Sequence, residues 1–327
     1  MVYLYIMYME THDYNKTLLD AVRAKLSADI NPVWFVMDIL SIGKEAAYRR
    51  LRGEVCLNLQ EAVLLSKKLG ISLDEITENY DEKIQHLHMR LAEFENPDER
   101  DYHILREYID LLLSSSMDTF SHITISTNTF PQQIYLGYKS LLNFFLFKWI
   151  YHNKSGRGKA YHQVKIPNRM QQIFDDSLHA YRQFASTCFI FDKQIGQSLV
   201  TDLKHFVSIG LIREEDKENI RREAYIMLNY MEQICINGVY ENGNKVQIYI
   251  SDISFERSYY NLKIHENYLS IIEACILNGV ASSNKISYLK MEEWIDSRRR
   301  LSTLITQSGE FQRIEFFSSL RKLLDEL

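Results

Sequence analysis

Basic side chains are concentrated near the N-terminus of an otherwise acidic chain. Residues 41–68 contain six Lys or Arg against three Glu, a local excess of +3, whereas the whole chain carries a net charge of −5. Ammonium and guanidinium groups attract phosphates and donate hydrogen bonds to them, so this excess is the footprint expected of phosphate binding. The net negative charge argues against a protein that coats nucleic acid through its total positive charge. Any contact with nucleic acid must therefore be local.

The densest part of this cluster falls on a predicted helix over residues 44–52. Ala47 and Leu51 are one helical turn apart and are expected to face a core, and the small side chain of Ala46 lets a neighbouring helix approach closely. The side chains left on or near the outer face are Lys44, Glu45, Tyr48, Arg49 and Arg52. The alternative interpretation is a solvated helix that carries a few charges.

Short helices with clear boundary signals surround this segment. Asn31-Pro32 marks the start of one helix, Ser41-Ile42-Gly43 forms a tight turn after it, and Gly53 ends the next helix. The sequence predicts five short helices in all, at about 15–26, 33–40, 44–52, LQEAVLLSKKLG after the capping residue Asn58, and LDEIT after Ser72.

The stretch VWFVMDILSIGKEAAYRRLRGEVCLNLQEAVLLSKKLGISLDEI at 33–76 resembles the lambda-repressor/Cro-like helix-turn-helix family, also called the XRE family. The resemblance covers about a fifth of the chain and rests on the short first helix, the turn centred on Ile42, the RxxRG ending at 49–53 and the closing LGISLDEI. The family often has Gly where this chain has Ser41, and a capping Ser or Thr where it has Gly43. These departures leave the identity of the helix cap open.

The resemblance implies that the third helix enters the major groove of double-stranded DNA. Lys44, Tyr48 and Arg49 are then candidates for base contact, since Lys and Arg donate to guanine O6 and N7 and Tyr packs against a thymine methyl or donates to phosphate. Arg50 and Arg52 are candidates for phosphate contact. The full predicted DNA-binding set is Lys44, Glu45, Tyr48, Arg49, Arg50 and Arg52. We expect a homodimer, because one such module contacts a single half-site.

The rest of the chain is rich in core material and poor in helix breakers. With 46% apolar residues, only 12 Gly and 4 Pro, and a length of 327 residues, it is expected to form two or three largely helical units. Strand patterns occur at 122–127 and 245–253, and more weakly at 187–191 and 258–264. Helical patterns occur at 131–152, 168–184, 194–207, 214–236, 266–278, 285–306 and 309–326.

These patterns predict a mainly α protein with three parts. The first is a five-helix, lambda-repressor-like DNA-binding domain at 14–80, and the second is a helical connector at 81–118. The third, at 119–327, is expected to be a mostly helical α+β domain built around a small antiparallel sheet, which serves dimerisation.

Several patterns typical of other protein classes are incomplete. The four cysteines lie far apart without a CxxC, which indicates neither zinc nor a disulfide framework and fits a reducing cytoplasm. The opening MVYLYIMYM lacks the basic region of a signal peptide. The most apolar later stretch, 136–152, is shorter than the roughly 20 apolar residues that are needed to span a bilayer. We therefore expect a cytoplasmic protein with no membrane partner.

Catalytic and metal-binding patterns are weak as well. The loop HNKSGRGKAYH at 152–162 matches a phosphate-binding loop only at Gly158-Lys159, so nucleotide hydrolysis is not supported. His86 and His88 lie about 200° apart on a helix and do not form a metal-binding face. The run 298–300 of three arginines is typical of a solvated helix face. We expect no metal, no cofactor and no enzymatic activity.

The sequence thus favours a dimeric, DNA-binding transcription regulator. The segments 251–262 and 294–317 could line a ligand cavity, although buried packing explains their aromatic residues equally well, so a small-molecule or peptide effector is left open. One rival is an enzyme domain tethered to DNA, which would require a titratable cluster in a cleft. Another is a protein-interaction scaffold, which would show no salt-dependent binding to any duplex.

Overall fold

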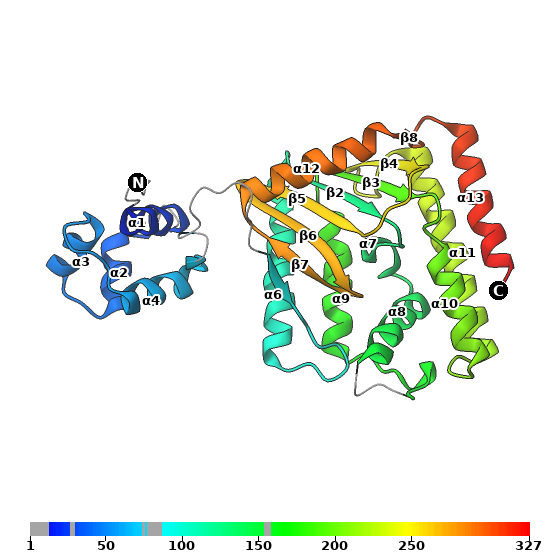
Figure 1. Cartoon of the computed structure of the whole chain (residues 1–327), viewed down its shortest axis with the longest axis horizontal. Coiled ribbons are helices and arrows are strands. Elements are labelled where there is room, and N and C mark those ends of the chain that lie inside the picture. The colour runs from blue at the N-terminus through cyan, green and yellow to red at the C-terminus, as the bar shows by residue number, and fades with distance from the viewer. Residues whose placement is uncertain (1–12, 27–29, 74–75, 77–86, 154–157) are drawn as a thin grey trace, which may run out of the picture. The chain divides into compact units, whose positions relative to one another are not determined.

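The computed structural model describes the chain except for residues 1–12, 27–29, 74–75, 77–86 and 154–157. The chain divides into two compact units, Met1–His86 and Leu87–Leu327, which are unit 1 and unit 2 below (Figure 1). The opening MVYLYIMYM lies outside the described residues.

Unit 1 is a small helical unit. Its described helices are α1 (Tyr14–Lys25), α2 (Pro32–Leu40), α3 (Lys44–Leu51) and α4 (Leu59–Leu69). Asn31 caps α2 by accepting from the Val33 amide at 2.9 Å, and Asn58 forms a reciprocal capping box with Glu61 on α4, which confirms the predicted cap. One face of each helix contributes to a single apolar core, made of Leu18, Leu19, Val22, Val36, Ala47, Leu51 and Leu65.

The structure of unit 1 does not show the predicted five-helix, lambda-repressor-like domain. Four helices have described bounds in unit 1. In the predicted fifth helix, LDEIT, Leu73 and Ile76 are helical, but residues 74, 75 and 77 lie outside the described residues, so a domain of five helices is not shown.

Unit 2 is built on an eight-stranded mixed sheet. Its strand order is β1-β7-β6-β5-β2-β3-β4-β8, in which β2, β3 and β4 are parallel and the other neighbours antiparallel. The strands are β1 (His88–Arg90), β2 (His122–Thr127), β3 (Ser186–Asp192), β4 (Lys245–Ser251), β5 (Tyr259–Ile264), β6 (Asn267–Cys275), β7 (Asn278–Ser282) and β8 (Ser302–Leu304).

The prediction of a small antiparallel sheet in unit 2 is therefore wrong. The four strand patterns of the sequence do form β2, β3, β4 and β5, but 266–278, predicted as a helix, holds β6 and the start of β7. An apolar run such as NYLSII fits both a buried strand and a helix, so its periodicity does not separate the two. The parallel pairs join strands separated by helices, and such long-range pairing leaves no local signal in the sequence.

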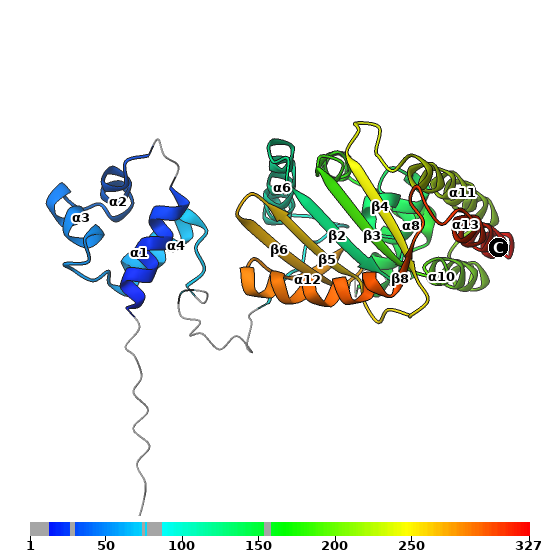
Figure 2. The same cartoon turned by 90° about the horizontal axis from the view of Figure 1, so that it is seen from above.

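Helices cover the two faces of the sheet unequally (Figures 1 and 2). One face is covered by a helical layer, whereas α12 (Lys285–Arg300) lies on the other. Side chains that alternate along a strand point to opposite faces of the sheet, and the two faces differ in the same way. Ile123 and Ile125 belong to the large core beneath the helical layer, while Cys188 packs in a small cluster near α12. The helical layer comprises α6 (Glu99–Leu113), α7 (Gln132–Tyr135), α8 (Lys139–His152), α9 (Asn168–Tyr181), α10 (Gln197–Ser208), α11 (Glu214–Asn237) and α13 (Glu310–Asp325).

In the segment predicted as a helical connector, 81–118, the described residues 87–118 supply a strand, an α-helix and the short 3-10 helix η1 (Ser114–Met117) to unit 2. Strand β1 pairs with β7 at the edge of the sheet, and α6 packs against α9. No helix among the described residues combines the length and the apolar character needed to cross a membrane.

Candidate functional site

The turn between α2 and α3 adopts a left-handed backbone at Ser41. This residue has φ 53° and ψ 45°, and its amide donates to the Met37 carbonyl. Glycine adopts this left-handed conformation without steric strain, which agrees with the frequent glycine at this position in the resembled family. Gly43 then adopts an extended backbone at the cap of α3 and has no side chain to accept a hydrogen bond. The turn is thus held by the backbone rather than by a capping side chain.

Helix α3 separates apolar from charged side chains. Ala47 and Leu51 are buried in the core of unit 1, as their spacing predicts. Lys44, Glu45, Arg49 and Arg52 are exposed, and Tyr48 is half-buried beside them. The Arg52 guanidinium lies 5.5 Å from the centre of the Tyr48 ring, a cation–π contact. Five of the six predicted residues therefore lie together along the outer side of the helix.

Glu54 is the acidic neighbour of the two exposed arginines. Its carboxylate lies 3.7 Å from Arg49 and 3.4 Å from Arg52, and all three side chains are about half exposed or more. Ion pairs in such positions contribute little to stability, because water screens them. Both guanidinium groups can therefore exchange this carboxylate for another anion at small cost.

Arg50 is placed apart from the other predicted residues. Its guanidinium donates to both carboxylate oxygens of Glu61 on α4, at 2.7 and 3.1 Å, and to the Ala46 carbonyl at 3.3 Å. The two side chains of the pair are only 18% and 12% exposed. The Arg50 guanidinium beside Glu61 lowers the pKa of that carboxyl below its usual value. Arg50 thus joins α3 to α4 instead of extending from the outer face.

Replacing Arg50 with Met is expected to lower the free energy of unfolding of unit 1 by about 1–3 kcal/mol, because the mostly buried Glu61 carboxylate loses its partner. Hydrogen exchange in α3 and α4 of the full chain measures the change. The loss should be present at neutral pH and should shrink as the pH falls below the usual pKa of glutamate, since the depressed pKa of Glu61 stabilises the fold only while the carboxyl is ionised. The exposed Arg52→Met variant is the matched control and should change stability by less than about 0.5 kcal/mol. Equal effects of the two variants would contradict the structural role of Arg50.

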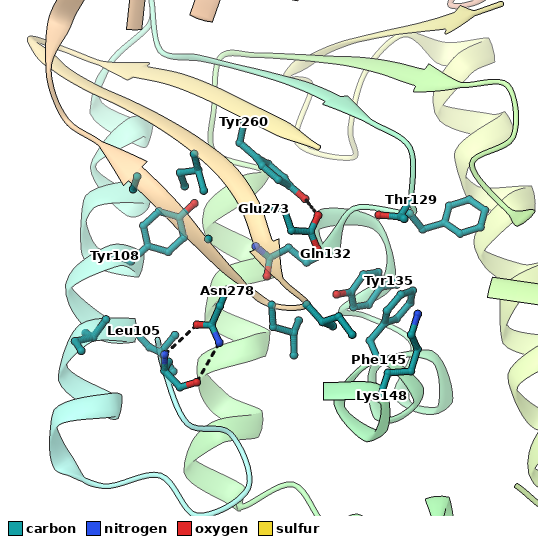
Figure 3. Close-up of a pocket in the computed structure, with 18 of the residues that line it drawn as sticks. Leu105, Tyr108, Thr129, Gln132, Tyr135, Phe145, Lys148, Tyr260, Glu273 and Asn278 are labelled. Atoms are coloured by element: carbon teal, nitrogen blue, oxygen red, sulfur yellow. Dashed lines mark hydrogen bonds between the residues drawn. The ribbon is translucent and has the colours of Figure 1, made fainter. Parts of the chain in front are cut away.

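Unit 2 contains a pocket of about 170 Å³ between the sheet and its helical layer (Figure 3). Strands β5, β6 and β7 form one wall, α6 and α8 form others, and the segment after β2 closes an end. Most of the lining is aliphatic or aromatic. The lining residues include Leu105, Tyr108, Phe130, Tyr135, Phe145, Tyr260, Leu269, Ile271, Glu273 and Asn278.

Glu273 brings a carboxylate into this apolar lining (Figure 3). Burial raises its pKa, and the hydroxyls of Ser258 and Tyr260 and the charge of Lys148 oppose that shift only in part. The Tyr260 hydroxyl donates to it across 3.5 Å, a long and weak hydrogen bond. Opposite Glu273 on β7 stands Gly279, where a Cβ would meet the Ile271 side chain at 2.7 Å and the Ile272 carbonyl oxygen at 2.9 Å. Any larger residue at 279 would therefore displace the wall beside the carboxylate.

Asn278 fixes the pocket wall to the chain entering unit 2. Its side chain accepts from the Ala92 amide at 2.9 Å and donates to the Ala92 carbonyl at 3.2 Å (Figure 3). Both residues line the pocket, and β1 ends two residues before Ala92.

A larger and more polar cavity of about 710 Å³ lies on the α12 side of the sheet. It is lined by the first residues of the three parallel strands and by Asp296 and Arg299, which form an ion pair at 3.0 Å. His122 also lines the cavity, and its ring forms a hydrogen bond of 2.6 Å with the Tyr288 hydroxyl. Several of the polar groups around this cavity are thus paired with one another.

The weaker sequence signals have different positions in the structure. Lys159, from the loop resembling a phosphate site, forms an ion pair with Glu95, while Lys154 and Arg157 lie outside the described residues. Arg298, predicted on a solvated face, instead packs over the Phe255 ring at 4.4 Å, whereas Arg300 is exposed. His86 lies outside the described residues, and the part of the chain that the structure describes contains no group of three or more potential metal ligands.

Sequence reasoning missed Glu273 and most of the 170 Å³ pocket. The segment 251–262, considered as a cavity lining, does supply Tyr260, and 294–317 lines the larger cavity. A single carboxylate inside the apolar run SIIEAC is the signal that could have identified Glu273, but only if the run had been assigned as a strand. Comparisons of the chain with protein-family models, with curated proteins and with solved structures found no match.

Proposed function

We propose that this protein binds double-stranded DNA through α2, the turn at 41–43 and α3, and that it regulates transcription as a homodimer. The observation that carries the proposal is the outer side of α3, where Lys44, Arg49 and Arg52 are exposed while the opposite side of the helix is buried in the core. A helix with this division can enter the major groove without exposing apolar surface. The resemblance of residues 33–76 to the lambda-repressor/Cro-like family supports the same orientation.

In this proposal the side chains have different tasks. Lys44 and Arg49 donate to base edges, with Tyr48 beside them, and Arg52 donates to a phosphate. Arg50 has no direct part, because its guanidinium is occupied by Glu61. Two copies read two half-sites, which makes the operator an approximate palindrome.

The test is selection of fragments from genomic DNA by the full chain, followed by titration of an enriched duplex at several salt concentrations. Wild type should bind with an affinity that falls steeply with salt, and the triple variant Lys44→Ala, Arg49→Ala, Arg52→Ala should lose specific binding. The matched control removes three exposed positive charges from unit 2, as Lys204→Ala, Arg222→Ala, Lys290→Ala, and should bind as wild type does.

Two other outcomes would oppose the proposed DNA binding by α3. Equal losses in the two triple variants would indicate nonspecific attraction to positive charge and would contradict the proposal. Absence of salt-dependent binding to any duplex would favour the protein-interaction scaffold instead.

A further inference from the structure

The 170 Å³ pocket of unit 2 has the size of a small organic molecule. Engineered apolar cavities of about 150 Å³ bind benzene, so an aromatic ring or an aliphatic body of similar volume fits. Leu105, Leu269 and Ile271 supply aliphatic surface, and Phe130 and Phe145 supply ring surface. The lining therefore selects a compact, mainly apolar occupant.

Glu273 adds one specific electrostatic requirement. Among the described residues, no Lys, Arg or His forms an ion pair with it, although its carboxylate lies in an apolar lining. Lys148, the positively charged residue of the lining, is already paired with Asp202 on α10. A carboxylate in such surroundings is stabilised most by a cation that brings its own hydrogen-bond donors.

Aromatic rings in the same pocket lining favour the same partner. Tyr108, Tyr135 and Tyr260 all line the pocket, and the Tyr135 ring stacks on Phe145 with 3.9 Å between ring centres (Figure 3). The negative faces of such rings attract an ammonium group that is removed from water. A carboxylate ligand would instead meet Glu273 without a free cation to balance it.

We propose that this pocket binds a small primary amine with an apolar, ring-sized body, its ammonium donating to Glu273 and its body packed against the rings and aliphatic side chains of the lining. This inference concerns unit 2 and does not depend on DNA binding by unit 1. The amine is recognised by charge, by its donors and by size.

The test uses calorimetric titration of the full chain, without DNA, with three probes of similar shape: 2-phenylethylamine, 2-phenylethanol and 3-phenylpropionate. The amine should bind at least about ten-fold more tightly than the alcohol, and the carboxylate should show no binding. Glu273→Gln should weaken amine binding at least about ten-fold and leave the alcohol unchanged. The matched control, Glu266→Gln, removes an exposed carboxylate from the turn between β5 and β6 and should leave all three affinities unchanged.

A second variant checks the location of binding independently of charge. Ala281→Leu adds side-chain volume to the wall contributed by β7 and should weaken the amine and the alcohol together. Circular dichroism of each variant confirms that it is folded. Equal affinities of amine and alcohol for wild type, absence of amine binding at millimolar concentration, or an unchanged amine affinity in folded Glu273→Gln would each overturn the proposal. Loss of DNA binding in the α3 variants has no bearing on these outcomes, so the two proposals fail separately.

Discussion

Arg49→Ala is expected to weaken binding of the full chain to its preferred duplex by about 1–3 kcal/mol for each half-site, and to relax the preference at one base pair. Arg49 lies on the outer side of α3, its side chain is 54% exposed, and its nearest carboxylate partner, Glu54, lies 3.7 Å away. A guanidinium so placed can donate to guanine O6 and N7. The measurement is titration of the operator and of a scrambled duplex, in which operator binding should fall more.

Two control variants separate base reading from phosphate attraction. Arg52→Ala should weaken both duplexes similarly and reduce the salt slope by about one unit for each phosphate that its guanidinium neutralises. Glu54→Gln removes the carboxylate that lies near both arginines and should strengthen binding to both duplexes. If Arg49→Ala and Arg52→Ala both kept wild-type affinity and preference, α3 would not be the reading helix and the proposed function would fail.

Leu65→Ala is expected to unfold a large fraction of unit 1 while unit 2 stays folded. Leu65 is fully buried in the core cluster described in unit 1, and truncating such a leucine costs about 2–5 kcal/mol. A unit this small has little stability beyond that amount. Hydrogen exchange of the full chain should show faster exchange throughout α1–α4 and unchanged exchange in the sheet of unit 2, and DNA affinity should fall with the folded fraction of unit 1.

The neighbouring Leu64 provides the control for this variant. Its side chain is 40% exposed, so Leu64→Ala should change the free energy of unfolding by less than about 0.5 kcal/mol. Loss of protection in unit 2 upon Leu65→Ala would show that the two units unfold together, contrary to the expectation from their separate cores.

Local signals in the sequence were sufficient to predict the helix starts, the cap and the buried face of the elements around α3. Asn31-Pro32, the Asn58 cap and the spacing of Ala47 and Leu51 depend on neighbours within one or two helical turns, and the structure confirms all three. The partner of Arg50 was beyond that range, because Glu61 is eleven residues away and on another helix. The sequence therefore predicted which side chains lie on the outer side of α3, but not that Arg50, a candidate for phosphate contact, pairs with Glu61.

Long-range pairing limited the prediction for unit 2. The parallel register of Ile125 beside Phe189 joins segments separated by three α-helices, and no local pattern encodes it. The helical assignment of 266–278 also hid the pocket, because Glu273 and Ile271 share a wall only when the segment is a strand. Assigning a helical period to a segment that forms a strand thus made both the predicted fold class and the predicted site wrong in this region.

The Asn278–Ala92 hydrogen bonds make the apolar pocket of unit 2 depend on pairing between distant parts of the chain. Asn278 begins β7 and Ala92 follows β1, so the two bonds continue the contact between these strands along the pocket wall. An occupant that packs against Ala92 and Asn278 binds best while both bonds are formed. By linkage, the same occupant stabilises the pairing of β1 with β7 at the edge of the sheet.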